Sequence, residues 1–377
     1  MSWRAARLPR DLHPVAWWLW AIGLAAYAST TTNHWLLLLL IGVAAVVVAT
    51  RRGDQPWSRS FRLYLGIGVV IVLVRVLFRI LLGGLPGHVV LDLPEIPLPH
   101  WVLGIRLLGP ITREALVAGL DDGLRLAAIV ICLGAANALA NPKRLLRSVP
   151  PALYEVGTAV VVAVTVLPQL AESVRRVRAA QALRAGATGR VGRLRRFLVP
   201  VLEDALERSL ALAAGMDVRG YGRAGDVPRR RRLTTSALLL LGLVGLCVGV
   251  YAVLDGTAPR WLAAPMLTLG CVAAIAGLVL AGRRVVRTVY RPDRWRWPEL
   301  VVVASGLAVG GVGWWIGRHD AAVAYPDVSG AAAVSLLALV GVLLGLVPAL
   351  VAPEPLLLDG APEVATEPAH GSAEVAA

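Results

Sequence analysis

The sequence contains a single lysine in 377 residues, Lys143, which follows Asn141-Pro142. An ATPase phosphate loop needs a glycine-rich turn ending in Lys-Ser or Lys-Thr, because backbone amides and the lysine together hold the phosphates. The sequence has no such loop. The chain therefore cannot supply the usual ATPase chemistry. Any ATP-driven role would need ATP bound by separate subunits, and we expect no cofactor in this chain.

Cysteine and histidine are also scarce. The three cysteines, Cys132, Cys247 and Cys271, lie inside apolar runs and lack the spacing of a zinc site or a disulfide framework, so we expect packing residues. The six histidines form no HExxH motif, which predicts no metal site. His88 and His100 flank a proline-rich segment, where they either touch a metal cargo or remain solvated.

Apolar residues, in contrast, are abundant. They make up 57% of the chain, and the mean hydropathy is +0.68, which is more apolar surface than one soluble core can bury. A helical bilayer crossing needs about 20 mostly apolar residues. Eight runs approach that length: 15–29, 35–49, 61–83, 114–140, 235–254, 262–282, 299–317 and 331–352. The sequence therefore predicts an all-α, polytopic membrane helical bundle.

The distribution of charge predicts the orientation. Lys and Arg gather on alternate sides of the eight runs, so the positive-inside rule places both termini in the cytoplasm, with the chain in a bacterial plasma (inner) membrane. The same rule accounts for the net charge of +14, and we expect no nucleic-acid partner. The predicted domains are N-terminal membrane helices (1–140), a basic cytoplasmic region (141–234), C-terminal membrane helices (235–352) and a disordered acidic tail (353–377).

The basic region decides how a short apolar stretch is interpreted. Residues 141–235 hold 18 Lys plus Arg against seven Asp plus Glu. Val156–Leu167 is short for a crossing, and as a crossing it would send the arginines after it to the outside. We therefore predict that Val156–Leu167 is a tilted or interfacial helix, buried against the other helices.

Two stretches of this region, Pro168–Gly186 and Pro200–Gly220, resemble each other. Proline suits the first helical turn, acids near it complement the helix dipole, and arginine followed by glycine suits the helix end. Each stretch therefore predicts a helix that begins at its proline and ends near Arg184 or Arg219. The proline-to-arginine spacings are 16 and 19 residues, a difference of about one helical turn, so both arginines should emerge at comparable ends.

The stretches RVRAAQALRAG (Arg176–Gly186) and ALAAGMDVRGYG (Ala211–Gly222) resemble the two Ala-Arg-Gly signatures of one transporter family. This is the energy-coupling factor (ECF) transporter transmembrane component, the T component or EcfT/CbiQ family of cobalt-permease type. Leu12-His13-Pro14 and NPKRLLRSVP (Asn141–Pro150) resemble further family motifs, so the resemblance covers about residues 12–222. The arginine is the only residue of the Ala-Arg-Gly signature that both copies share with each other and with the family pattern.

The resemblance implies a non-catalytic scaffold subunit of an ABC-type importer for a metal ion or vitamin. Its implied partners are two ABC-type ATPase subunits, a substrate-binding membrane (S) subunit and the lipid bilayer. The ATPase contacts fall on Arg184, Ala185, Gly186, Arg219 and Gly220. An arginine in a last turn can also simply complement the helix dipole, worth about 0.3–1 kcal/mol, but two matched copies inside a longer resemblance favour docking.

Charges also occur inside the third and fourth apolar runs. Arg75 and Arg79 lie four apart on one face, and Arg75 is near the middle of its run, where a bare charge requires a partner. Asp121 and Asp122 are candidate partners. Asp121 and Arg125 are also spaced four apart on the fourth run, and we predict that they pair with each other. Two interpretations stay open: an intramembrane polar seam, or snorkelling of Arg79 with a local pair for Arg75.

A polytopic membrane enzyme and a self-contained channel are the rival classes. An enzyme predicts acids or histidines clustered at one membrane depth, which the sequence does not contain. A channel predicts function without ATPases, with the basic region as an ordinary loop.

Overall fold

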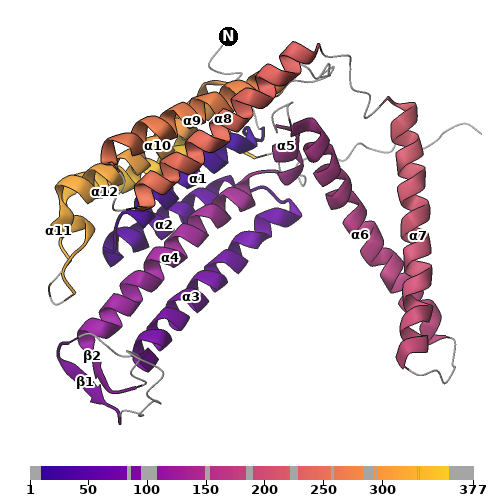
Figure 1. Ribbon diagram of the computed structural model, residues 1–377. Coiled ribbons are helices and arrows are strands. Elements are labelled where there is room, and N and C mark those ends of the chain that lie inside the picture. The colour runs from indigo at the N-terminus through magenta and orange to yellow at the C-terminus, as the bar shows by residue number, and fades with distance from the viewer. Residues whose placement is uncertain are drawn as a thin grey trace, which may run out of the picture. The chain divides into compact units, whose positions relative to one another are not determined.

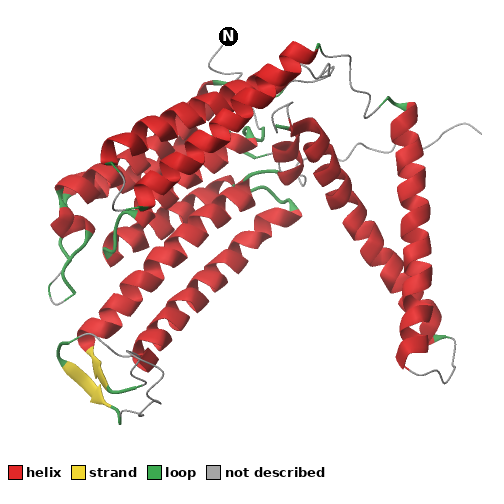
Figure 2. Ribbon diagram, in the orientation of Figure 1, coloured by secondary structure: helices red, strands yellow, loops and turns green. Residues whose placement is uncertain are grey.

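The computed structural model describes residues 10–82, 86–94, 108–148, 153–183, 190–220, 228–255, 259–282, 293, 295–328, 330 and 332–355. Within them the regular secondary structure is helical apart from two antiparallel strands, β1 (Val89–Asp92) and β2 (Pro110–Thr112) (Figure 1, Figure 2). The all-α prediction is therefore confirmed. The helices form two compact units: Met1–Leu145 with Asp293–Ala377, and Leu146–Pro292.

The helix bounds follow the apolar runs closely. The first unit holds α1 (Pro14–Ser29), α2 (His34–Arg51), the 3₁₀ helix η2 (Pro56–Ser60), α3 (Phe61–Leu82), α4 (Arg113–Leu139), α10 (Trp297–His319), α11 (Ala321–Ala324), α12 (Leu336–Leu343), η4 (Leu344–Leu346) and α13 (Val347–Val351). The second holds α6 (Tyr154–Ala182), α7 (Arg190–Val218), α8 (Arg229–Leu254) and α9 (Arg260–Gly282), and α5 (Pro142–Arg147) lies at the boundary.

Six helical segments in the described part of the chain are long and apolar enough to cross a membrane: His34–Arg51, Trp57–Leu82, Val156–Ala182, Arg229–Leu254, Trp261–Gly282 and Trp297–His319. The third of these contains Val156–Leu167, whose predicted interfacial placement stays a prediction. Its predicted burial against the other helices is wrong, because Val156 and Leu167 are 59% and 71% exposed among the described residues. The eighth apolar run is instead broken into α12, η4 and α13. Trp20 Nε1 donates a hydrogen bond to the Gly345 carbonyl at this break (3.1 Å), so the interruption does not leave that buried acceptor unpaired.

Glycine allows the helices of the first unit to touch backbone to backbone. A Cβ on Gly23 of α1 would lie 2.0 Å from the Gly306 oxygen of α10, and a Cβ on Gly306 would lie 2.4 Å from the Trp20 Cα. Small residues permit such close approach where lipid offers no hydrophobic force between helices. In the second unit, Gly245 of α8 faces Gly270 of α9 in the same way.

Polar contacts mark two ends of the first unit. At what we call the His34 end, Arg125 donates to the Ser29 carbonyl, and the Asn33 amide donates to the carbonyls of Val323 (3.0 Å) and Ala333 (2.8 Å). The opposite, Arg51 end includes Asn141, which follows α4. The 18 residues of α2, from His34 to Arg51, join the two ends and make about 27 Å of helix. This is close to the hydrocarbon thickness of a bilayer.

Candidate coupling helices and polar clusters

The candidate coupling helices α6 and α7 are longer than predicted. They begin at Tyr154 and Arg190, so Pro168 and Pro200 lie inside helices. The prediction that each helix begins at its proline is therefore wrong. An interior proline removes one intrahelical hydrogen bond and strains the preceding turn. In α6 the helical residues on both sides continue through it, and the apolar stretch Val156–Leu167 becomes the first half of that helix.

Asp204 of α7 joins the two helices. Its carboxylate receives a hydrogen bond from Ser173 of α6, lies 3.7 Å from Arg176 of α6 and accepts 3.1 and 3.2 Å bonds from Arg208 one turn along α7. The hydrogen bond from Ser173 is the largest cause of a lowered pKa for Asp204, and Arg208 and Arg176 act in the same direction. Ser173 is buried whereas the Asp204 side chain is 32% exposed, so the contact lies at the edge of the helix crossing.

A row of leucines on α7 has no cover in the described residues. Leu202, Leu206 and Leu210 recur every four positions, and each is 61% exposed. Residues spaced by four lie on one face of a helix. This leucine stripe is therefore a continuous apolar surface that a partner or the bilayer would have to cover.

The predicted arginine sites differ in how far the structure describes them. α7 ends at Val218, and Arg219 and the following Gly220 are both exposed. Gly220 has φ of 74° and its N–H donates to the Asp217 carbonyl (2.9 Å), the left-handed stop that glycine favours. A Cβ at Gly220 would meet nothing within 4 Å. Arg184, Ala185 and Gly186 lie outside the described residues.

The two acids of α4 form separate pairs, one with α3 and one with α2. Arg79 Nη2 lies 3.2 Å from Asp122 Oδ2, and Asp121 Oδ1 lies 3.2 Å from His34 Nδ1. Arg125 binds the Ser29 carbonyl rather than Asp121. Because His34 begins α2, these groups lie at the level where the α1–α2 connection ends the bundle.

Arg75 is placed differently. Its side chain is exposed, although its Cβ lies against Gly123 of α4, and no ion pair of Arg75 is found in the described part of the chain. The structure thus brings Arg79, Asp121 and Asp122 into pairs at the His34 end and leaves Arg75 one helical turn from Arg79. Arg79, Asp121 and Asp122 therefore make a group of charges at one level of the bundle, and Arg75 lies one turn away from it.

The Arg51 end carries a cluster that the sequence patterns did not reveal. Arg10 makes a two-point contact with Glu299, at 2.7 and 3.0 Å, and the Glu299 carboxylate also accepts the Arg296 N–H (3.1 Å) while the residue is fully buried. His13 caps α1 by accepting the Val15 N–H at Nδ1 (3.3 Å). Burial lowers the pKa of His13, against the opposing influence of Asp293, which suits this neutral acceptor role.

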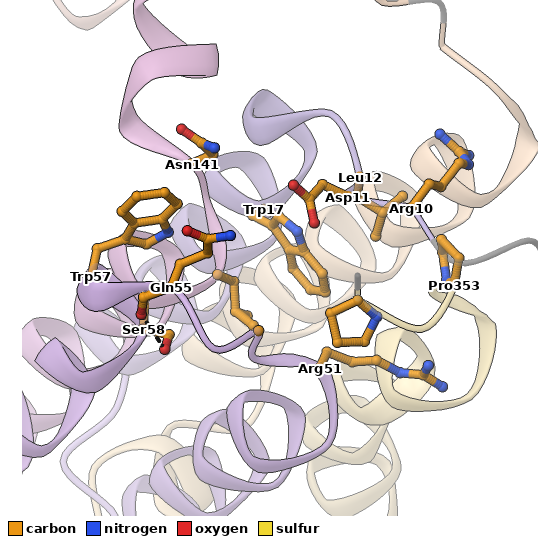
Figure 3. Close-up of a pocket in the computed structure, with 14 residues that line it drawn as sticks. Arg10, Asp11, Leu12, Trp17, Arg51, Gln55, Trp57, Ser58, Asn141 and Pro353 are labelled. Carbon is orange, nitrogen blue, oxygen red and sulfur yellow. Dashed lines mark hydrogen bonds between the residues drawn. The ribbon is translucent and has the colours of Figure 1, made fainter. Parts of the chain in front are cut away.

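A small pocket lies beside this cluster (Figure 3). Asp11, Trp17 and Asn141 line it together with Arg51 and Trp57 from the α2–α3 connection. Arg51 lines the pocket while its Nε and Nη2 both donate to the Ala349 carbonyl, at 3.1 Å from Nε. The pocket therefore joins segments that are distant in sequence.

Among the described residues, no three His, Cys, Asp or Glu side chains gather as a metal site would require. His88 lies in the described part, where its N–H donates to Glu114 Oε2 (2.8 Å), and His100 lies outside it. A search of curated proteins finds no match to this chain. The family model for the CbiQ cobalt transport protein matches residues 5–229, which is more than half of the sequence. The chain is a multi-pass membrane transport component that belongs to the CbiQ family of cobalt transport proteins.

Proposed function

We propose that the chain is the T subunit of an ECF-type importer, in which α6 and α7 couple two separate ABC-type ATPases to a substrate-binding membrane subunit. The single observation that carries this proposal is the end of α7. There Arg219 projects beside a left-handed Gly220 with open space around it. A guanidinium presented in this way suits a bidentate contact with a carboxylate in a partner groove.

The composition of the chain supports a role for separate ATPase subunits. Its one lysine follows Asn-Pro rather than a glycine-rich loop, so ATP would be bound by the partner subunits. The matched counterpart of Arg219 is Arg184, with Ala185 and Gly186 permitting close approach. In this proposal each arginine contacts one ATPase.

The leucine stripe on α7 supports a further, apolar partner. Leu202, Leu206 and Leu210 are exposed on the same helix whose end carries Arg219. We infer that the substrate-binding membrane subunit covers this stripe, so that one helix contacts both partners. The cargo would be a metal ion or a vitamin, and the chain would lie in the bacterial plasma membrane with both termini and the Arg51 end in the cytoplasm.

Affinity purification in mild detergent tests the proposal. The wild-type chain should bring down stoichiometric ATPase subunits. Arg219→Glu and Arg184→Glu should each reduce their recovery about tenfold or more, because a charge-assisted hydrogen bond is worth about 1.5–3 kcal/mol and reversal adds repulsion. Arg195→Glu is the matched control, since Arg195 is an exposed arginine on α7 away from its end.

The outcome separates the proposal from a self-contained channel or enzyme. Loss of the ATPases in the double variant, with normal membrane levels, supports coupling. If the wild-type chain is recovered alone and transport survives both reversals, the coupling role is rejected.

A further inference from the structure

Helix α10 buries one face within the first unit and exposes the opposite face. The buried face carries Val302, Val309 and Ile316, each at most 2% exposed, and it meets α1 at Gly306. The opposite face is apolar for most of its length, and α10 is long and apolar enough to cross a membrane. What covers this face is therefore either lipid or another protein segment.

Four residues of the exposed face form one row along the helix axis. They are Leu307, Gly311, Trp314 and Arg318, whose spacings of four, three and four positions keep them within about 60° of one another. Leu307 is 61% and Trp314 54% exposed, and a Cβ at Gly311 would meet nothing within 4 Å. This α10 row is thus a gap between two large apolar side chains, with a positive charge at one end.

The charge at the end of the α10 row is held in place but has no acidic partner. The Arg318 guanidinium lies 4.4 Å from the centroid of the Trp314 ring, a cation–π contact that keeps it against the helix. No ion pair or hydrogen bond of the Arg318 side chain is found in the described part of the chain, although Asp320 is only two residues away. Its N–H groups are therefore available to an anion.

The length of the α10 row fits one leaflet of a bilayer. Arg318 follows Leu307 by 11 positions, or about 16 Å of helix, and half of a hydrocarbon core is about 15 Å thick. Arg318 is also next to the last residue of α10, and Trp314 and Trp315 lie just before it, where aromatic residues mark a membrane interface. The guanidinium thus lies at headgroup level and the gap at Gly311 at acyl-chain level.

We propose that the α10 row is a binding site for one anionic phospholipid of the bilayer. Arg318 donates hydrogen bonds to the phosphate, and an acyl chain lies along α10 in the gap at Gly311, between Leu307 and Trp314. A headgroup of net negative charge is the complement, because the row carries one positive charge and no negative one. The site does not depend on coupling to ATPases, so it stands or falls apart from the proposed function.

A general interfacial anchor predicts a different behaviour. Arginine and tryptophan near a helix end can simply place the helix at headgroup level, without selecting a lipid. Such an anchor holds charged and zwitterionic lipids equally, and it tolerates a larger side chain at Gly311. The proposed site requires selectivity for charge at Arg318 and sensitivity to side-chain size at Gly311.

Native mass spectrometry of the full chain in detergent measures the charge selectivity. The chain is titrated with phosphatidylglycerol or with phosphatidylcholine that has the same acyl chains, and the fraction carrying one lipid is measured. The wild type should favour phosphatidylglycerol about fivefold, the factor that one arginine near the surface supplies. Arg318→Gln should remove this preference. Arg113→Gln, at another exposed arginine that begins α4 at the same end of the unit, should keep it.

Gly311→Leu tests the acyl-chain gap. Leucine fills the gap, so this variant should bind both lipids several-fold more weakly than the wild type. Gly42→Leu is the matched control, because a Cβ at Gly42 of α2 also meets nothing within 4 Å, but residues 35–49 around it contain no arginine. All four variants should keep the thermal midpoint of the wild type, since none of these side chains packs inside the unit.

Two results would overturn the proposal. One is an Arg318→Gln variant that favours phosphatidylglycerol as strongly as Arg113→Gln does, or a wild type without any preference, since either would mean that Arg318 selects no lipid. The other is Gly311→Leu binding phosphatidylglycerol as tightly as Gly42→Leu does. The guanidinium would then bind a phosphate without an acyl chain in the gap, and the row would not be a phospholipid site.

Discussion

At the scale of single residues, Asp204 shows how one carboxylate can hold two coupling helices. Its carboxylate accepts a hydrogen bond from Ser173 of α6 and forms ion pairs with Arg176 of α6 and Arg208 of its own helix. These contacts favour the ionised form and lower its pKa in the folded chain. A carboxyl with a lowered folded pKa stabilises the fold above its unfolded pKa of about 4, and the stabilisation is lost as pH falls through the folded value.

Asp204→Asn should therefore loosen α6 against α7 near neutral pH. Amide hydrogen exchange of the full chain in detergent measures this: the variant should exchange faster than wild type in both helices at pH 7. The difference should vanish below the folded pKa, where the wild-type carboxyl is also neutral. Glu203→Gln, at the adjacent exposed acid, should exchange as wild type does at every pH. An Asp204→Asn effect that persisted unchanged in acid would contradict the electrostatic explanation.

At the scale of elements, the apolar runs and the helix-start signals predicted where helices occur better than where they begin. The run 15–29 corresponds to α1 (Pro14–Ser29) and the run 61–83 to α3 (Phe61–Leu82). The agreement is close because an apolar run of bilayer length has few alternatives to a helix. The prediction that helices begin at Pro168 and Pro200 was wrong, because proline, which favours a first helical turn, also occurs inside these two long helices. The break at η4 had a local signal in Gly345 and Pro348, but its hydrogen bond from Trp20 joins residues 325 positions apart and had none.

The contact between α1 and α10 gives the element-scale prediction. Gly306→Val should force these helices apart and destabilise the protein by about 1–3 kcal/mol, as overpacking of a closed interface does. Gly311→Val on the same helix is the control, because a Cβ at Gly311 meets nothing within 4 Å. Thermal unfolding in detergent compares them. Equal midpoints for the two variants would show that the close approach of α1 to α10 does not limit stability.

At the scale of the whole molecule, the C-terminal segment is part of the bundle that begins the chain. The sequence identified Leu12-His13-Pro14 and Asn141–Pro150 as family motifs, yet it gave no sign that Arg10 pairs with Glu299 or Arg144 with Asp293. Such pairs join residues 289 and 149 positions apart, and neither helical spacing nor local charge pattern reports contacts of that range. Arg219 at the end of α7 was accessible to sequence analysis because its signal, an arginine followed by glycine, is local.

Cysteine labelling in intact cells tests the orientation of that bundle. We expect a membrane-impermeant maleimide to label Asp327→Cys, because this exposed residue follows α11, whose Val323 carbonyl binds Asn33 at the His34 end. Asp54→Cys, just past Arg51, should be protected until the cells are permeabilised. The two sites differ because α2 spans the apolar layer between them and arginines favour the cytoplasmic side. With the native cysteines replaced, labelling of Asp54→Cys from outside would reverse the topology and place the end of the bundle that carries the Arg144–Asp293 pair out of reach of cytoplasmic ATPases.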